Sequence, residues 1–299
     1  MLAGRCRTMN GLAMHSPSLD KPGGFLKQST GLENPDIERG CAMVNDYMQF
    51  GLKEKVAIVT GASQGIGREL ARGLAQAGVH VALVSRTAPP LEETAREIQG
   101  MGVKALACPT DLRDVSQIRA MVAQVRDHFG KIDILVNNAA WTATVEALEV
   151  TEEEWDQTVG TCLKAVFFTS QAAARVMVAA GHGKIVNIGS TFGQVAFKGR
   201  SVYAAAKAGV HHLTRALAYE WAPKGINVNG VAPCITETPT RKEMLQRPGY
   251  KEWATGQMLP IGRWAQPEDF VGPTLFLCSS LSDMVVGHVL MVDGGWTIH

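Results

Sequence analysis

The sequence has almost no excess of charge of either sign. Its 299 residues include 29 Lys+Arg and 28 Asp+Glu, which gives a formal net charge of +1, and no basic run is present. Proteins that bind nucleic acid or an anionic membrane surface carry clustered positive charge. We therefore expect neither as a main partner.

Long uninterrupted apolar runs are also missing. The longest apolar stretch, residues 165–180, is broken by Thr169, Ser170, Gln171 and Arg175. A membrane-spanning helix needs about 20 consecutive apolar residues. The sequence therefore predicts a soluble protein without a membrane span.

Cysteine is scarce and shows no pairing pattern. There is no C-x-x-C motif and no zinc-like cluster of cysteine with histidine among Cys6, Cys41, Cys108, Cys162, Cys234 and Cys278. Scattered cysteines of this kind indicate buried free thiols in a reducing compartment rather than disulfides. We expect a cytoplasmic protein without a metal site.

Residues 1–50 differ from the rest of the chain. Prolines and glycines such as Pro17, Pro22 and Gly24 break any periodicity, and no apolar signal-peptide core is present. We expect an irregular or loosely docked arm. A transit peptide and a start at Met43 or Met48 are the alternatives.

Residues 51–299 alternate between strand and helix patterns. At 46% hydrophobic residues, the chain can bury one large α/β core or two small ones. This rhythm predicts a parallel sheet of about seven strands with helices on both faces. The expected strands are residues 56–59, 79–85, 103–108, 132–136, 184–189, 226–231 and 288–292, and the expected helices begin near residues 66, 91, 115, 152, 203 and 267.

Residues 236–259 break this rhythm. Pro239, Pro248, Gly249 and Gly256 interrupt any regular element there. We predict a mobile lid over the active site, with a plain surface excursion as the alternative.

A glycine-rich stretch, Thr60-Gly61-Ala62-Ser63-Gln64-Gly65-Ile66-Gly67, follows the first expected strand and precedes a helix. Glycines at such a turn let the backbone approach a pyrophosphate, and the helix N-terminus offers unpaired N–H groups to it. A glycine triplet alone is weak evidence, but its position between strand and helix favours dinucleotide binding.

The pair Tyr203 and Lys207 lies in an alanine-rich run. Residues four apart share one face of a helix, and a nearby ammonium favours the phenolate form of tyrosine. Ser190 ends the preceding strand, so its hydroxyl can meet the pair at the carboxyl edge of the sheet. Such a pair is often only a surface contact, but together with the glycine-rich stretch it predicts acid–base catalysis.

These motifs, in this order, resemble the short-chain dehydrogenase/reductase family. They are Thr60-Gly61-x-x-x-Gly65-x-Gly67, Asn137-Asn138-Ala139-Ala140, Ser190, Tyr203-x-x-x-Lys207 and Val228-Asn229-Gly230-Val231-Ala232-Pro233. The resemblance spans about residues 52–296 and implies one Rossmann-type domain, NAD(P)-dependent interconversion of an alcohol and a ketone, and a homotetramer. Within the family, the chain is also similar to the branch of gluconate 5-dehydrogenase and 2-deoxygluconate 3-dehydrogenase. This finer similarity lies at residues 181–185, 263–264, 272–273 and 292–296.

The resemblance also assigns roles to residues. Tyr203 would be the proton donor in ketone reduction, Lys207 would hold the nicotinamide ribose, and Ser190 would bind the substrate oxygen. Asp111 would meet adenine, and Asn137 would lie along the cofactor. The cofactor contacts implied are Gly61, Ser63, Gln64, Gly65, Ile66, Gly67, Arg86, Asp111, Leu112, Asn138, Ala139, Tyr203, Lys207, Pro233, Ile235 and Thr238.

Two positions depart from the family pattern. Cys162 stands where an asparagine usually helps to hold a water of the proton relay, and a thiol is a weak donor and acceptor. We expect a weakened or rerouted relay, with a catalytic thiol as the alternative. Cys234 replaces a usual glycine and either reshapes the nicotinamide wall or only fills space.

The end of the second strand predicts the cofactor. An acid there binds the ribose 2′-hydroxyl of NAD, whereas an arginine accommodates the 2′-phosphate of NADP. This chain has Ser85-Arg86-Thr87 and no acid before Glu92, while Gln64 replaces a second basic residue that NADP-dependent relatives often carry. We therefore expect NADP(H) to be preferred over NAD(H), with Arg86 as the single cation available.

The sequence thus predicts an oxidoreductase that acts on a small hydroxylated substrate such as a sugar acid. A 3-oxoacyl-thioester reductase or a broad carbonyl reductase is the alternative enzyme. A non-catalytic NAD(P)H-binding regulator is the alternative of another class, because fold analogy alone does not decide function.

Overall fold

The computed structural model describes residues 50–298. The arm expected over residues 1–50 lies outside this part of the chain, apart from Phe50. Cys6 and Cys41 also lie outside it, and the four cysteines inside it carry free thiols.

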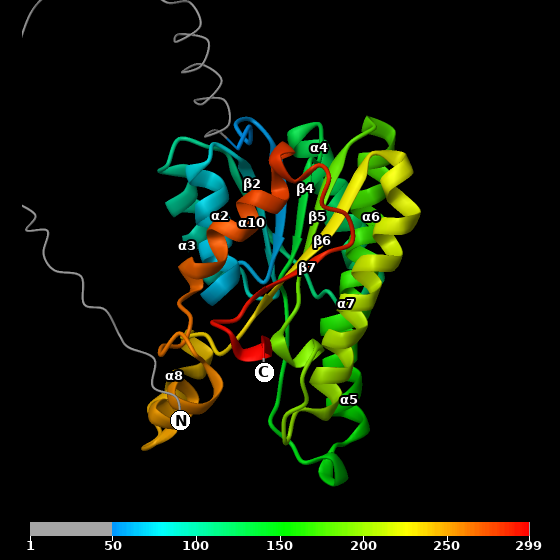
Figure 1. Cartoon of the computed structure of the whole chain (residues 1–299). Helices are drawn as coiled ribbons and strands as arrows, with labels where there is room; N and C mark the ends of the chain where they lie inside the picture. The colour runs from blue at the N-terminus through cyan, green and yellow to red at the C-terminus, as the bar shows by residue number, and fades with distance from the viewer. Residues whose placement is uncertain (1–49, 299) are drawn as a thin grey trace, which may run out of the picture. The chain divides into compact units, whose positions relative to one another are not determined.

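A single seven-stranded sheet forms the centre of the described part (Figure 1), and all its neighbouring strands are parallel. The predicted fold class is confirmed. The strands lie in the order β3-β2-β1-β4-β5-β6-β7. Their bounds are β1 Val56–Thr60, β2 His80–Ser85, β3 Ala105–Pro109, β4 Ile134–Asn137, β5 Gly183–Ile188, β6 Ile226–Pro233 and β7 Val289–Val292.

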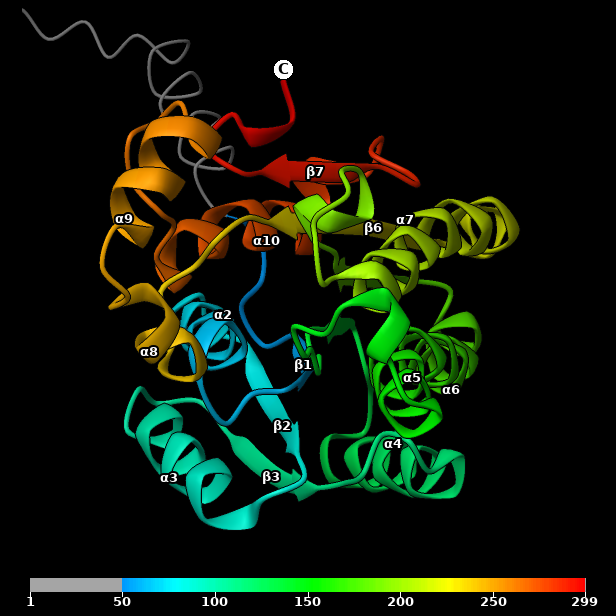
Figure 2. The same ribbon diagram turned by 90° about the horizontal axis from the view of Figure 1, so that it is seen from below.

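Helices cover both faces of the sheet, as the view in Figure 2 shows. The helices are α2 Gly65–Gln76, α3 Ala88–Gln99, α4 Val115–Phe129, α5 Glu152–Val159, α6 Ala165–Ala180, α7 Ser201–Trp221, α8 Lys242–Leu245, α9 Tyr250–Trp253 and α10 Val271–Cys278. Successive residues of a strand point to opposite faces. Ala57 of β1 accordingly packs in the core under α2, α3 and α10, whereas Ile58 packs in the core under α4, α6 and α7.

The strand order reverses direction between β1 and β4. From β1 the chain builds outward to β2 and β3, and it then returns to place β4 on the other side of β1. In open α/β sheets, ligands bind in the crevice beyond the carboxyl ends of the strands at such a switch point. The fold therefore directs attention to the residues that follow β1 and β4.

The helix expected over residues 152–180 is not regular throughout. A π-helical turn, Gly160–Lys164, separates α5 from α6 and contains Cys162. The whole run Glu152–Ala180 is long and apolar enough to pass for a membrane span, which differs from our expectation. A single helix of this length and composition is weak evidence, because core helices of soluble proteins pass the same test, and 44% of its most apolar stretch is buried inside the protein.

Residues 236–259 form short elements instead of a regular helix. They include α8, α9 and a π-helical turn, Ala254–Met258. Leu245, Ala254 and Leu259 are buried in a third apolar cluster with Tyr203 and Trp296. This segment, which we call the lid segment, thus packs beside the catalytic helix predicted from the sequence.

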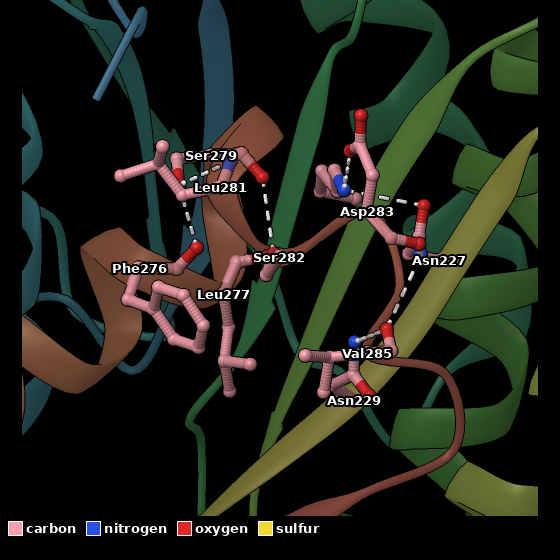
Figure 3. A network of polar contacts seen from close by, with 10 residues as sticks. Asn227, Asn229, Phe276, Leu277, Ser279, Leu281, Ser282, Asp283 and Val285 are labelled. Carbon is pink, nitrogen blue, oxygen red and sulfur yellow. Dashed lines mark hydrogen bonds and ion pairs between the residues drawn. The ribbon is translucent and has the colours of Figure 1, made fainter. Parts of the chain in front are cut away.

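The connection from α10 to β7 is held by β6 (Figure 3). Asn227 Nδ2 donates to the carbonyl oxygens of Asp283 (2.9 Å) and Val285 (3.2 Å), and Asn229 Nδ2 donates to that of Val285 (2.7 Å). Asn229 Oδ1 accepts from the backbone N–H of His288 at 2.9 Å. These bonds hold the connection against β6, so that β7 lies beside β6.

Candidate active site

The glycine-rich turn forms the floor of a cavity of about 380 Å³ at the switch point. The N-cap residue of α2, Gln64, makes no side-chain capping bond, and no acid lies in the first turn. Unpaired N–H groups therefore remain at a helix N-terminus, where phosphate binds. A Cβ on Gly67 would lie 2.2 Å from the Gly61 carbonyl oxygen, so this close approach requires glycine.

Asn138 holds the glycine-rich turn in place. Its Nδ2 donates to the carbonyl oxygens of Thr60 (3.0 Å) and Gly61 (3.2 Å). Thr60 Oγ1 in turn accepts from the backbone N–H groups of Asn138 (2.9 Å) and Ala139 (3.0 Å). The ends of β1 and β4 are thereby joined directly beneath the cavity.

Asn137 does not lie along the cavity, contrary to our expectation. It is 3% exposed, and its Nδ2 donates to Ser170 Oγ and Asn187 Oδ1, both at 2.9 Å. The last residue of β4 points into the core, and the next residue faces the cavity, because side chains alternate along a strand.

Ser190, Tyr203 and Lys207 meet at one end of the cavity. Tyr203 lies in the first turn of α7, one turn before Lys207, and the lysine Nζ is 5.7 Å from the centre of its ring. The three side chains are 7%, 8% and 2% exposed, respectively. The helical pairing expected from the four-residue spacing is thus present.

The hydrogen bonds of these residues leave donors free toward the cavity. Ser190 Oγ accepts from the Phe192 N–H at 3.2 Å, so its own O–H can donate to a ligand. Lys207 Nζ donates to the Ile188 carbonyl at 2.6 Å and has no other protein acceptor within residues 50–298. An ammonium carries three N–H groups, so two remain for hydroxyls of a ligand.

His211 lies behind this end of the site. Its Nε2 is 3.4 Å from the backbone N–H of Ser190, and a Cβ on Gly189 or Gly193 would clash with its ring. Burial, together with the positive charges of Lys207 and Arg215, lowers the pKa of His211 to about 4. The ring is therefore neutral at pH 7 and can accept the Ser190 N–H.

Cys162 contacts the backbone of the loop after β4. Its thiol donates to the Trp141 carbonyl (3.1 Å) and accepts from the Trp141 N–H (3.4 Å). Burial raises the pKa of Cys162, although Lys207 opposes this effect. The thiol is therefore protonated at neutral pH, which argues against a catalytic thiolate.

The opposite end of the cavity suits a charged nucleotide. Arg86, Asp111 and Leu112 line it as predicted, and so does Arg113, which sequence reasoning missed. Arg113 Nη2 lies 2.6 Å from Asp111 Oδ2, and this hydrogen bond lowers the pKa of Asp111 to about 2. Arg86 is therefore not the only cation there, but Arg113 is already paired.

Most of the remaining predicted contacts also reach the cavity. It is lined by Ser63, Gln64, Gly65, Ile66, Ala139, Pro233 and Thr238. Ile235 is the exception, because its side chain is 3% exposed and belongs to the third apolar cluster. Cys234 lines the wall, and burial raises its pKa to about 11.

Sequence reasoning missed other lining residues. They are Trp141 and Thr142 of the loop after β4, Gln157 of α5, Thr161 of the π-helical turn and Arg241 of the short 3-10 turn before α8. The only available signals were the glycine and proline breaks that marked residues 236–259 as irregular.

A phosphate-binding glycine-rich turn lies beside a serine, a tyrosine and a lysine that have hydrogen-bond donors available to a ligand. This arrangement defines a nicotinamide-dependent oxidoreductase. The short chain dehydrogenase family model matches residues 55–249. The chain belongs to the short-chain dehydrogenase family.

Three similar proteins illustrate the range of substrates and cofactors among the relatives of this chain. The chain is 41% identical to 2-dehydro-3-deoxy-D-gluconate 5-dehydrogenase of Escherichia coli (strain K12) over 83% of this chain and 97% of that protein. It is 35% identical to an NAD-dependent glycerol dehydrogenase of Listeria innocua over 83% and 96%. The crystal structure of a gluconate 5-dehydrogenase from Burkholderia cenocepacia J2315 in complex with NADP and tartrate superimposes with a TM-score of 0.81 at 36% identity, covering 84% of this chain and 98% of that one.

Proposed function

We propose that the protein interconverts a secondary alcohol and a ketone on a sugar acid and prefers NADP(H). The carrying observation is that Ser190, Tyr203 and Lys207 line the same cavity as the glycine-rich turn. Relatives and structural neighbours that act on gluconate or its keto derivatives support the substrate class. We further propose that the enzyme acts in the cytoplasm as a homotetramer.

The residues at the catalytic end divide the work of proton transfer. Tyr203 donates its hydroxyl proton to the substrate oxygen during ketone reduction and accepts it during alcohol oxidation. Ser190 donates a hydrogen bond to the same oxygen, and Lys207 holds hydroxyls of the nicotinamide ribose. The bound nicotinamide cofactor supplies or accepts the hydride, while the protein supplies position and electrostatics.

The residues at the other end fit a phosphorylated ribose. Arg86 follows β2 and is exposed, and it has no ion pair within residues 50–298. A guanidinium can form charge-assisted bonds to a 2′-phosphate. The neighbouring structure with NADP supports this choice, whereas the NAD-dependent glycerol dehydrogenase supports the other.

Absorbance at the NADPH band tests the proposal. The purified protein is assayed with keto sugar acids, sugar acids, neutral polyols and 3-oxoacyl thioesters, each with NADP(H) and with NAD(H). We expect the highest kcat/KM for a sugar acid or its keto form with NADP(H). Faster reduction of acyl thioesters would favour the reductase alternative, and tight NADPH binding without any turnover would favour a regulator.

A further inference from the structure

His211 fills a slot behind the catalytic residues. On α7 it lies one turn after Lys207 and two turns after Tyr203, and all three side chains are buried. Residues four apart in a helix share one face. The residues that line the catalytic cavity include Tyr203 and Lys207 but not His211. Any role of this histidine in the reaction therefore has to pass through a neighbouring residue.

Two glycines form the walls of this slot. An added Cβ on Gly189 would lie 2.4 Å from His211 Nε2, and one on Gly193 would lie 2.6 Å from its Cε1. Both distances are shorter than any real Cβ contact, so the ring fits only because these two positions carry no side chain. The segment between the two glycines contains Ser190. The imidazole thus packs directly against the turn that presents the serine.

Side chains of α7 hold the backbone on both sides of Gly189. Lys207 Nζ donates to the Ile188 carbonyl at 2.6 Å, on the side of β5. On the other side, the buried N–H of Ser190 donates to His211 Nε2 at 3.4 Å, and it has no other acceptor within residues 50–298. Buried backbone N–H groups are almost always paired, because an unpaired one costs free energy. His211 therefore supplies an acceptor that this turn needs.

The same turn determines where the Ser190 hydroxyl points. Ser190 Oγ accepts from the Phe192 N–H at 3.2 Å, and the Ser190 carbonyl accepts from the Gly193 N–H at 2.9 Å. With the bond to His211, every polar group of the serine has a protein partner, and only its O–H is free to donate to a ligand. A small displacement of a group that contacts the reacting atoms lowers the rate strongly.

We propose that His211 is a positioning residue for Ser190: it accepts the Ser190 N–H and thereby keeps the serine hydroxyl directed at the substrate oxygen. The inference rests on the proposed function, in which Ser190 donates a hydrogen bond to that oxygen. His211 itself contacts neither substrate nor cofactor and acts through the backbone of the serine. The competing explanation is that the ring only fills space between α7 and the turn.

Matched substitutions separate the hydrogen bond from the volume of the ring. His211→Leu fills the slot without an acceptor, His211→Gln can place its Oε1 near the position of Nε2, and the exposed neighbour His212→Leu is the control. We expect kcat to fall about 10- to 100-fold in His211→Leu and to recover most of this loss in His211→Gln. The Kd for NADPH, measured by fluorescence titration, should stay unchanged. A His211→Leu variant as active as the wild type, or equal losses in the two variants, would show that the ring only fills space.

A double-mutant cycle with Ser190→Ala shows whether His211 acts through the serine. Residues that act as a unit lose activity non-additively. We therefore expect His211→Leu to change kcat by less than about threefold when Ser190 is already alanine. Losses that multiply in the double variant would assign a structural role to His211 and overturn the proposal.

Gly193→Ala displaces the ring without changing His211. The three atoms nearest to the added methyl group all belong to this ring, whereas a methyl group on Gly272, the control position, meets nothing within 4 Å. We expect Gly193→Ala to lose kcat as His211→Leu does, and Gly272→Ala to keep it. Full activity in Gly193→Ala would contradict the need for the ring at this position.

Hydrogen exchange distinguishes failure of this proposal from failure of the proposed function. Amide exchange of the peptide that covers residues 188–195 needs no turnover, so it can be measured even if the wild type reduces no sugar acid. We expect faster exchange in His211→Leu than in His211→Gln, and equal exchange would refute the bond to Ser190. Full turnover in Ser190→Ala would refute the role of the serine and its positioning together, whereas multiplied losses in the double variant would refute the positioning alone.

Discussion

Lys207 is one of the largest side chains that are fully buried in the described part of the chain. Burying an ammonium costs free energy unless it is hydrogen-bonded, and the protein supplies only the Ile188 carbonyl. The shortfall has a functional explanation, because ribose hydroxyls of a bound cofactor would satisfy the other N–H groups.

Also at the residue scale, a substitution of Arg86 tests the predicted preference for NADP(H) over NAD(H). Arg86→Ala removes the exposed guanidinium that is available for a 2′-phosphate, so KM for NADPH should rise about 10- to 100-fold, whereas KM for NADH should change little. Initial rates with each cofactor give both values. Equal effects on the two cofactors, or a wild type that prefers NADH, would show that Arg86 does not read the phosphate.

Cys162 provides a second residue-scale prediction. Cys162→Asn should keep or raise kcat, because an amide can both donate to and accept from the Trp141 backbone, as the thiol does. Cys162→Ser serves as a control that preserves this bonding without added volume. Collapse of activity in both variants, with an unchanged circular dichroism spectrum, would restore the case for a catalytic thiol.

At the scale of elements, α7 carries a buried histidine, His211, whose titration makes the stability of the fold depend on pH. The folded protein holds this histidine neutral down to about pH 4, whereas an unfolded chain protonates it near 6.5. The unfolded state therefore binds more protons between these values, and stability falls as pH drops through that window.

We expect the wild type to lose about 1 kcal/mol of unfolding free energy per pH unit from this group between pH 6.5 and pH 4. His211→Gln should lose less over the same range, while the exposed neighbour His212→Gln should behave as the wild type. Urea unfolding at pH 7 and pH 5 provides the comparison. Parallel pH dependence in the two variants would contradict a buried neutral His211.

The strands and most helices were predictable because buried apolar runs and helical periodicity are local signals. β4 begins at Ile134, two residues later than expected, and just before it the side-chain Oδ2 of Asp133 accepts the backbone N–H of Val56 at 2.8 Å. The π-helical turn at Cys162 has no local signal, since it depends on how α5 meets α6 and α7.

The residues of the candidate site likewise divide into those that local sequence patterns predict and those that depend on the tertiary fold. Tyr203 and Lys207 follow from a spacing of four, whereas the choice between Asn137 and Asn138 depends on which face the end of β4 presents. Arg113 and Arg241 reach the cavity only through the tertiary fold. Long-range placement of loop residues cannot be derived from periodicity.

At the scale of the whole molecule, we predict a homotetramer. Apolar surface on α5 and α7 is consistent with contacts between copies, since Trp155 is 50% exposed and Tyr219 is 87% exposed. Light scattering coupled to size exclusion should give a mass about four times the chain mass of 32.1 kDa. A monomer at micromolar concentration would contradict this assembly.

The most direct test of the account is Tyr203→Phe. The ring and its packing remain, and only the transferable proton is lost, so kcat should fall at least about 100-fold, as loss of a general acid implies. NADPH binding, followed by fluorescence titration, should be unchanged, and the exposed Tyr219→Phe should be fully active. A Tyr203→Phe rate within about tenfold of the wild type would contradict proton transfer by this tyrosine.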